Sequence, residues 1–217
     1  MNESLFLLHV FLVIGFALGA LRLGKAALTT WVALQAVLAN LFVIKQMSFF
    51  GFTVTCSDVF AIGSIAGLNL LQEYFGKDSA KRAALICFCS MIFFGLMGQI
   101  HLLYAPSPQD ATQAAFFTIL APTPRLLLAS FATFFIVQQI DVRFYSLLKK
   151  YSVAARGAVA LCVSQLLDTA LFSLLGLYGM VASLSDIIVV SFLVKLAIIA
   201  CMSPLTALSK KVVHHEI

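Results

Sequence analysis

The chain has 217 residues, of which 62% are hydrophobic and only 11% charged, and its mean hydropathy is +1.04. A water-soluble domain of this size needs more charged surface than 14 Lys and Arg residues and 9 Asp and Glu residues can supply. Lipid, in contrast, accepts apolar side chains on the outside of a protein. The composition therefore excludes a soluble fold, and the net charge of +5 indicates membrane topology and not a nucleic-acid surface.

Seven apolar runs are each long enough, at about 20 residues, to cross a bilayer core of about 30 Å. They cover residues 5–21, 26–44, 55–75, 83–104, 126–147, 157–178 and 187–208. Alternating strands of about ten residues do not occur in the sequence, so the spans are predicted to be helices. We expect an all-α membrane bundle of about seven transmembrane helices that forms a single transporter domain over residues 1–217.

The basic residues set the predicted orientation, because cytoplasmic connections carry an excess of Lys and Arg. With the N-terminus outside, the cytoplasmic connections hold Arg22, Lys25, Lys77, Lys81, Arg82, Lys149, Lys150, Arg156, Lys210 and Lys211. The outside connections hold only Lys45 and Arg125. We therefore expect an outside N-terminus and a cytoplasmic C-terminus. A cleaved signal peptide would need cations before the first run, where Asn2 and Glu3 stand.

Polar residues at membrane depth are the candidate functional groups, because ionisable groups in lipid usually face a bundle interior or a cavity. Residues three or four apart share one helix face. Three such pairs place a carboxylate beside an amide or a hydroxyl: Asn69 with Glu73, Gln138 with Asp141, and Ser164 or Gln165 with Asp168. Asp58, eleven residues before Asn69, lies close to the same face as Asn69 and Glu73.

Asp168 is the strongest of these candidates, because it lies about twelve residues into its helix and close to the predicted midplane. The rival interpretation is a structural pairing with Lys195, which would keep one carboxylate charged. Glu73, close to the cytoplasmic Lys77, is equally well explained as a helix-end residue that reaches the headgroups. The pairs Gly15-x-x-x-Gly19 and Gly63-x-x-x-Gly67 predict close helix contacts.

Catalytic and metal-binding patterns find little support. Ser64 has no histidine partner, and His214-His215-Glu216 lacks the spacing of a zinc protease. We expect no enzymatic activity, no cofactor and no metal. The proline-rich connection 105–125 has room for no more than a short surface helix.

Three segments together resemble the queuosine-precursor transporter family. They are Asn69-Leu-Leu-Gln-Glu73-Tyr-Phe-Gly76-Lys77, Gln138-Gln-Ile-Asp141-Val-Arg-Phe-Tyr145, and Ser164-Gln165-Leu-Leu-Asp168-Thr169-Ala-Leu-Phe172. Asn40, Lys195 and Pro204 also fall on matching positions. Asn69 stands where the family usually has Asp, and the first span looks like an addition to a six-helix core.

The resemblance implies a multi-pass importer in the bacterial inner membrane that takes up 7-deazaguanine bases (preQ0, preQ1 or queuine) for the salvage of tRNA queuosine. A carboxylate can accept both N–H donors of a guanine-like edge, and a second carboxylate favours a cationic aminomethyl group. The implied substrate-binding residues are Asn40, Asn69, Glu73, Gln138, Asp141, Gln165, Asp168 and Phe172, with Lys195 as charge partner; Phe172 or Tyr145 would stack on the ring.

Two other functions remain compatible with the sequence. One is a substrate-binding subunit of an ATP-driven vitamin-uptake complex, and the other is a membrane scaffold whose polar residues only join helices. The sequence does not fix energy coupling, a coupling subunit or a homo-oligomeric state.

Overall fold

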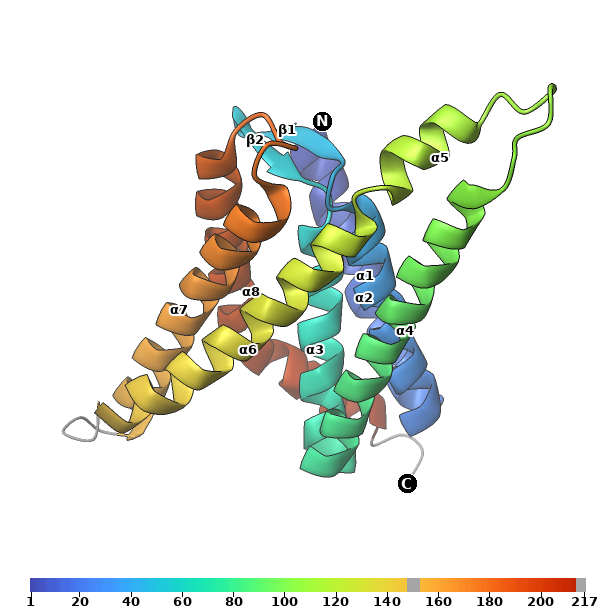
Figure 1. The fold of residues 1–217 in the computed structure, drawn as a ribbon. Helices are drawn as coiled ribbons and strands as arrows, with labels where there is room; N and C mark the ends of the chain where they lie inside the picture. Colours follow the sequence, from blue (N-terminus) through green and yellow to red (C-terminus); the bar gives the residue numbers. More distant parts are fainter. Residues whose placement is uncertain (148–152, 214–217) are drawn as a thin grey trace.

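The computed structural model describes the backbone of residues 1–147 and 153–213, and the side chains of residues 1–140, 159–197 and Ser209. In this part of the chain, seven helices of 18 residues or more form a bundle (Figure 1). They are α1 (Asn2–Arg22), α2 (Lys25–Phe42), α3 (Asp58–Phe75), α4 (Lys77–Leu103), α6 (Thr123–Leu147), α7 (Val153–Phe172) and α8 (Leu184–Val213). Each contains most of one predicted apolar run, so the predicted helical bundle is confirmed.

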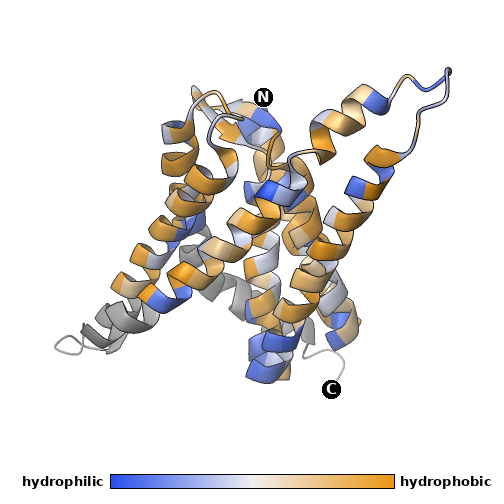
Figure 2. Ribbon diagram, in the orientation of Figure 1, coloured by the Kyte–Doolittle hydropathy of each residue, from blue (hydrophilic) through white to orange (hydrophobic). Residues whose placement is uncertain are grey.

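Five stretches of the described chain are long and apolar enough to cross a membrane: α1, α2, α4, residues 113–140 and residues 159–177. Large apolar side chains cover the outside of these helices, among them Phe11, Leu96 and Leu128 at 71%, 57% and 69% exposure. Figure 2 shows apolar residues over the middle of the bundle and hydrophilic ones gathered toward its ends. The chain is a polytopic helical membrane protein. α3 is not among the five stretches, because polar residues along it lower its hydropathy.

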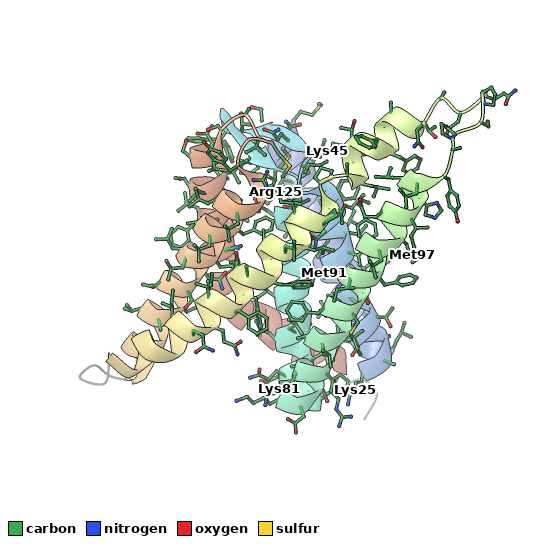
Figure 3. The ribbon with its side chains drawn as sticks, viewed as in Figure 1. Lys25, Lys45, Lys81, Met91, Met97 and Arg125 are labelled. Carbon is green, nitrogen blue, oxygen red and sulfur yellow. The ribbon has the colours of Figure 1, made fainter. Side chains whose placement is uncertain are left out.

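Basic residues lie at both ends of the bundle, divided as the predicted orientation requires. Lys25 and Lys81 lie at the end where the C-terminus lies, whereas Lys45 and Arg125 lie at the end of the N-terminus (Figure 3). This arrangement agrees with the charge distribution behind the predicted orientation. The orientation itself and the number of membrane crossings stay predictions.

A short β-hairpin between α2 and α3 was not predicted. β1 (Gln46–Phe49) pairs antiparallel with β2 (Phe52–Thr55). The turn residues Phe50 and Gly51 have φ of 48° and 85°, which is the left-handed pair of a type I′ hairpin turn. The hairpin lies at the N-terminal end of the bundle (Figure 1). The Thr53 amide donates to Asp186 Oδ2 at 3.1 Å and so ties the hairpin to the first turn of α8.

The proline-rich connection holds one short helix, α5 (Gln113–Leu120), and almost all of its side chains are exposed. This matches the prediction of at most a short surface helix. α6 begins two residues before Arg125, with Pro124 in its first turn, where a missing N–H costs no hydrogen bond.

Helices α1 to α4 share one buried core, which includes Ala17, Leu28 and Leu71. Gly63 and Gly67 are needed there: a Cβ at Gly63 would lie 2.6 Å from Gln35 Oε1, and a Cβ at Gly67 would collide with Val32. The prediction of close helix contacts is confirmed at these two glycines. It is wrong for Gly15 and Gly19, whose Cβ atoms would meet nothing within 4 Å because that face of α1 turns away from its neighbours.

A second buried cluster joins α6, α8 and the end of α2 at the hairpin side of the bundle. It consists of Val43, Leu126, Leu177 and Ile187. The first cluster lies within the N-terminal half of the chain, whereas the second joins Val43 to the C-terminal half. The candidate site lies between these halves.

Candidate functional site

A cavity of about 280 Å³ lies between the two halves of the bundle. Its walls come from α2, β2, α3 and α4 on one side and from α6, α7 and α8 on the other. Val43, Leu177 and Ile187, which belong to the second buried cluster, form part of its wall. The remaining wall carries most of the polar groups found at depth in the described part of the bundle.

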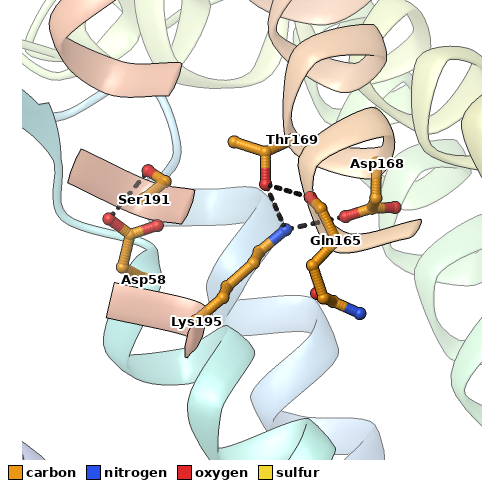
Figure 4. Close-up of polar contacts among 6 residues, drawn as sticks. All are labelled: Asp58, Gln165, Asp168, Thr169, Ser191 and Lys195. Carbon is orange, nitrogen blue, oxygen red and sulfur yellow. Dashed lines mark hydrogen bonds and ion pairs between the residues drawn. The ribbon is translucent and has the colours of Figure 1, made fainter. Parts of the chain in front are cut away.

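Helix α8 supplies two polar side chains to this cavity, Ser191 and Lys195. They are four residues apart and therefore lie one above the other on the same helix face. Each contacts a carboxylate from a different helix (Figure 4). α8 thus connects α3 with α7 through two polar contacts one turn apart.

Lys195 contacts α7. Its Nζ lies 2.7 Å from Asp168 Oδ2 and donates a second hydrogen bond to Thr169 Oγ1 at 3.0 Å. The Thr169 hydroxyl in turn donates to the Gln165 carbonyl at 2.8 Å. The Lys195 side chain is 14% exposed and that of Asp168 is 39% exposed, so the ammonium group is enclosed while the carboxylate remains open to a ligand.

Ser191 contacts α3. Its hydroxyl donates to Asp58 Oδ2 at 2.9 Å. Asp58 is the first residue of α3 and only 7% exposed, and the positive end of the helix dipole favours a carboxylate there. The Asp58 carboxyl group, unlike that of Asp168, has a neutral hydroxyl as its hydrogen-bond partner among the described residues.

Two further polar atoms on the cavity wall have no hydrogen-bond partner within the described structure. They are Thr133 Oγ1 on α6 and Asn40 Oδ1 on α2. The Asn40 amide nitrogen is occupied, because it donates to the Ala36 carbonyl at 3.0 Å and lies 3.0 Å from Met91 Sδ. Buried polar atoms are normally paired, so both oxygens are available to a ligand or to water.

Aromatic rings complete the wall, with Phe88 from α4, Phe134 from α6 and Phe172 from α7. A planar ring stacks favourably on such side chains. The cavity therefore combines aromatic faces, an ion pair and unpaired acceptors, which is a site for a small planar molecule with polar edges.

A π-helix shapes one corner of the site. α7 continues directly into η2 (Ser173–Leu177), whose two end residues both line the cavity. Arg125, at the start of α6, donates to the carbonyls of Leu175 and Tyr178 at 3.0 and 2.8 Å. π-Helical turns occur often at functional sites, and here the turn brings the Ser173 hydroxyl to the cavity wall.

The structure brings together four of the nine residues predicted for the site. Asn40, Asp168, Phe172 and Lys195 all line the cavity. Lys195 pairs with Asp168, which is the arrangement that the sequence offered as the alternative to a free carboxylate.

Four other predicted residues do not line the cavity. Asn69 and Glu73 are exposed on the C-terminal half of α3, near the end that carries Lys81, and Gln138 is exposed on α6. The Gln165 side chain is half-buried but is not part of the wall. A shared helix face with a carboxylate did not predict whether these residues line the cavity, because residue spacing alone does not show toward which neighbour the face is turned. The Asp141 side chain lies outside the described residues, as does that of Tyr145.

Asp58 and Ser191 are the residues that the sequence prediction missed. The sequence places Asp58 among the polar residues at membrane depth, near the face of Asn69 and Glu73, but gives it no role in the site, and Ser191 is a lone serine within another run. A signal existed in the spacing of Ser191 and Lys195, since two polar residues on one face of an apolar helix indicate a polar interior surface.

Comparison with known proteins identifies the family. Residues 55–209 match the sequence profile of a family described as "Putative vitamin uptake transporter". The chain belongs to this family. The matched region contains α3, α4 and α6 to most of α8, and with them Asp58, Asp168 and Lys195. Asn40 lies outside it.

A relative in Bacillus subtilis (strain 168) bears the name "Probable queuosine precursor transporter". It is 29% identical over 218 residues, which cover 97% of this chain and 93% of the relative. The alignment covers almost the whole chain and therefore includes at least part of α1. No solved structure matches the chain. The chain is therefore a member of a transporter family, and the predicted resemblance is confirmed.

Proposed function

We propose that the protein imports a queuosine precursor or a related 7-deazaguanine base across the bacterial inner membrane, for the salvage of tRNA queuosine. The observation that carries the proposal is the ion pair of Asp168 and Lys195 beside aromatic side chains in a cavity of about 280 Å³. This volume is at the small end of the range for small-molecule sites, which suits one bicyclic base.

The ion pair is complementary to the edge of a guanine-like ring. Such an edge presents a carbonyl oxygen next to two N–H donors, at N1 and at the exocyclic amine. Asp168 accepts both N–H groups in a bidentate pair, and Lys195 donates to the neighbouring carbonyl. Because Lys195 Nζ lies 2.7 Å from Asp168 Oδ2, the donor and the acceptor lie side by side, as the edge of the base requires.

The remaining wall serves the rest of the base. Phe172 stacks on the ring, Asn40 Oδ1 accepts from the N9–H group, and the Thr133 hydroxyl donates to N3. The proposed binding residues are therefore Asn40, Thr133, Asp168, Phe172 and Lys195. In this proposal the protein works as a transporter and not as an enzyme.

The test is the recovery of queuosine in tRNA. A bacterium that lacks both precursor synthesis and its own importer expresses the parent chain, Asp168→Asn, or the matched control Asp78→Asn, whose carboxylate is exposed at the start of α4. Each candidate base is supplied at low concentration. We expect rescue by the parent and the control and a loss with Asp168→Asn at equal membrane levels. Failure of the inserted parent with every base would refute the proposal.

A further inference from the structure

The two polar contacts of α8 create an uneven distribution of charge in the cavity. Ser191 and Lys195, one turn apart, hold Asp58 of α3 and Asp168 of α7 against the same stretch of helix. In Figure 4 the Lys195 side chain lies between the two carboxyl groups, with its ammonium group on the Asp168 side. If both carboxyl groups are ionised, one cation faces two anions.

The cation of Lys195 pairs with Asp168, so no second cation in the described part of the chain pairs with Asp58. The Ser191 hydroxyl and the N-terminus of α3 favour its carboxylate, but neither supplies a full positive charge. Among the described side chains, α6 and α2 bring only neutral groups to the cavity wall. Lys45 and His9 are near α3, but they line a different pocket together with Cys56. A buried, uncompensated carboxylate costs several kcal/mol, and proteins avoid it by binding a proton or a cation.

A second observation shows that the cavity leaves a place for a ligand near these groups. Thr133 is 1% exposed, its hydroxyl oxygen has no partner in the described structure, and it lines the same cavity as Asp58 and Asp168. A site complete in itself would satisfy this hydroxyl. The unpaired hydroxyl indicates a hydrogen-bonding ligand, and the two carboxyl groups beside a single cation favour a positively charged one.

We propose that Asp58 is the proton-binding residue of the cavity: it holds a proton while the cavity is empty or contains a neutral base, and releases it when a cationic base binds. This inference rests on the proposed function. The step balances in charge, because the carboxylic acid gives its proton to water and the ammonium group of the ligand then pairs with the carboxylate. The cavity is neutral before and after.

The geometry suits a base with an aminomethyl group. The 7-substituent is attached to the five-membered ring beside the C6 carbonyl, which Lys195 binds in the proposed pose. Asp58 of α3 lies on that side of the cavity, because its partner Ser191 is one turn before Lys195 on the same face of α8. A neutral substituent, such as a cyano group, has no reason to displace the proton.

Calorimetry on the purified full chain tests the exchange. The aminomethyl and the cyano 7-deazaguanine bind in two buffers with different ionisation enthalpies, so the heat difference counts protons. We expect about one proton released per aminomethyl base and none per cyano base. The affinity for the aminomethyl base rises with pH, because the proton and the ammonium group compete for Asp58.

Site-directed variants test whether the released proton comes from Asp58. Asp58→Asn should abolish proton release and weaken the aminomethyl base about tenfold or more, while the cyano base keeps its affinity within a few-fold. If Asp58→Asn does not fold, Ser191→Ala is the alternative variant, because it removes only the hydrogen bond from Ser191 to Asp58. This variant should shift the pH at which proton release appears. Asp78→Asn should behave as the parent.

Infrared spectroscopy gives a readout that needs no ligand. The empty parent protein should show the C=O stretch of a protonated carboxyl group at neutral pH, and Asp58→Asn should lack it. Binding of the aminomethyl base without proton release, or with sodium release in its place, would overturn the inference and leave the proposed function standing. If neither these two bases nor queuine binds, the proposed function fails, and the infrared band alone decides whether Asp58 holds a proton.

Discussion

Breaking the contact between Asp168 and Lys195 should destabilise the protein in an asymmetric way. Loss of one partner from a fully buried ion pair costs about 3–5 kcal/mol, whereas exposed pairs contribute about 0–1 kcal/mol. Here Lys195 is 14% exposed and Asp168 is 39% exposed. Asp168→Asn leaves the enclosed ammonium group with Thr169 as its remaining partner and should cost about 2 kcal/mol. Lys195→Met leaves the more open carboxylate and should cost about 1 kcal/mol.

The assay is thermal unfolding of the purified variants in detergent. For a chain of this size, about 1 kcal/mol corresponds to a fall of about 2–4 °C in Tm. We expect Asp168→Asn to lower Tm by about 4–8 °C and Lys195→Met by about 2–4 °C. The double variant should fall by clearly less than the sum, because residues in contact are not additive. Asp78→Asn and Lys81→Met, at exposed positions, are the matched controls.

Additive effects would refute this reasoning, since they would mean that the two side chains do not interact in the folded protein. A larger loss with Lys195→Met than with Asp168→Asn would also contradict it. That result would identify the carboxylate as the group that depends on its partner.

Three further predictions concern other parts of the fold. Gly63→Ala should destabilise the protein by about 1–3 kcal/mol in thermal unfolding, whereas Gly15→Ala, which meets open space, should not; equal effects would contradict the packing. Arg125→Met removes two hydrogen bonds to the end of η2 and should cost about 1 kcal/mol, and an unchanged Tm would show that water replaces them. The pKa of Asp110 is lowered below its usual 3.8 because its carboxylate accepts two hydrogen bonds from Thr112. Protection of the Thr112 amide from hydrogen exchange should therefore hold above pH 3.8 and be lost as the pH falls through the lowered pKa; protection that persists in acid would refute this.

The helices could be predicted because lipid imposes a simple demand. A run of about 20 apolar residues in a bilayer must satisfy its own backbone, and only a helix does so within one segment. The hairpin could not be predicted in the same way. Its strands have four residues each, and Phe50-Gly51 is not one of the Asn-Gly or Asp-Gly turns that mark a hairpin in sequence.

The site could be predicted only in part, for a related reason. Asp168 and Lys195 are charged residues deep in apolar runs, and such residues need a shared interior wherever the helices pack. Glu73 and Gln138 lie where an exposed polar side chain is tolerated, so a polar helix face does not determine whether they point into the bundle. Asp58 lies at membrane depth in the sequence, but nothing in the sequence indicates its partner. Its importance follows from the tertiary contact with Ser191, 133 residues away in the chain.

Uptake of a labelled 7-deazaguanine base into liposomes that contain only this purified chain tests directly whether the chain transports the base through the assigned site. We expect saturable uptake by the parent and by Asp78→Asn, with loss of uptake in Asp168→Asn. Uptake that is unchanged in Asp168→Asn would contradict the assigned site. A folded, correctly inserted parent chain that moves no base would contradict transport by the chain itself.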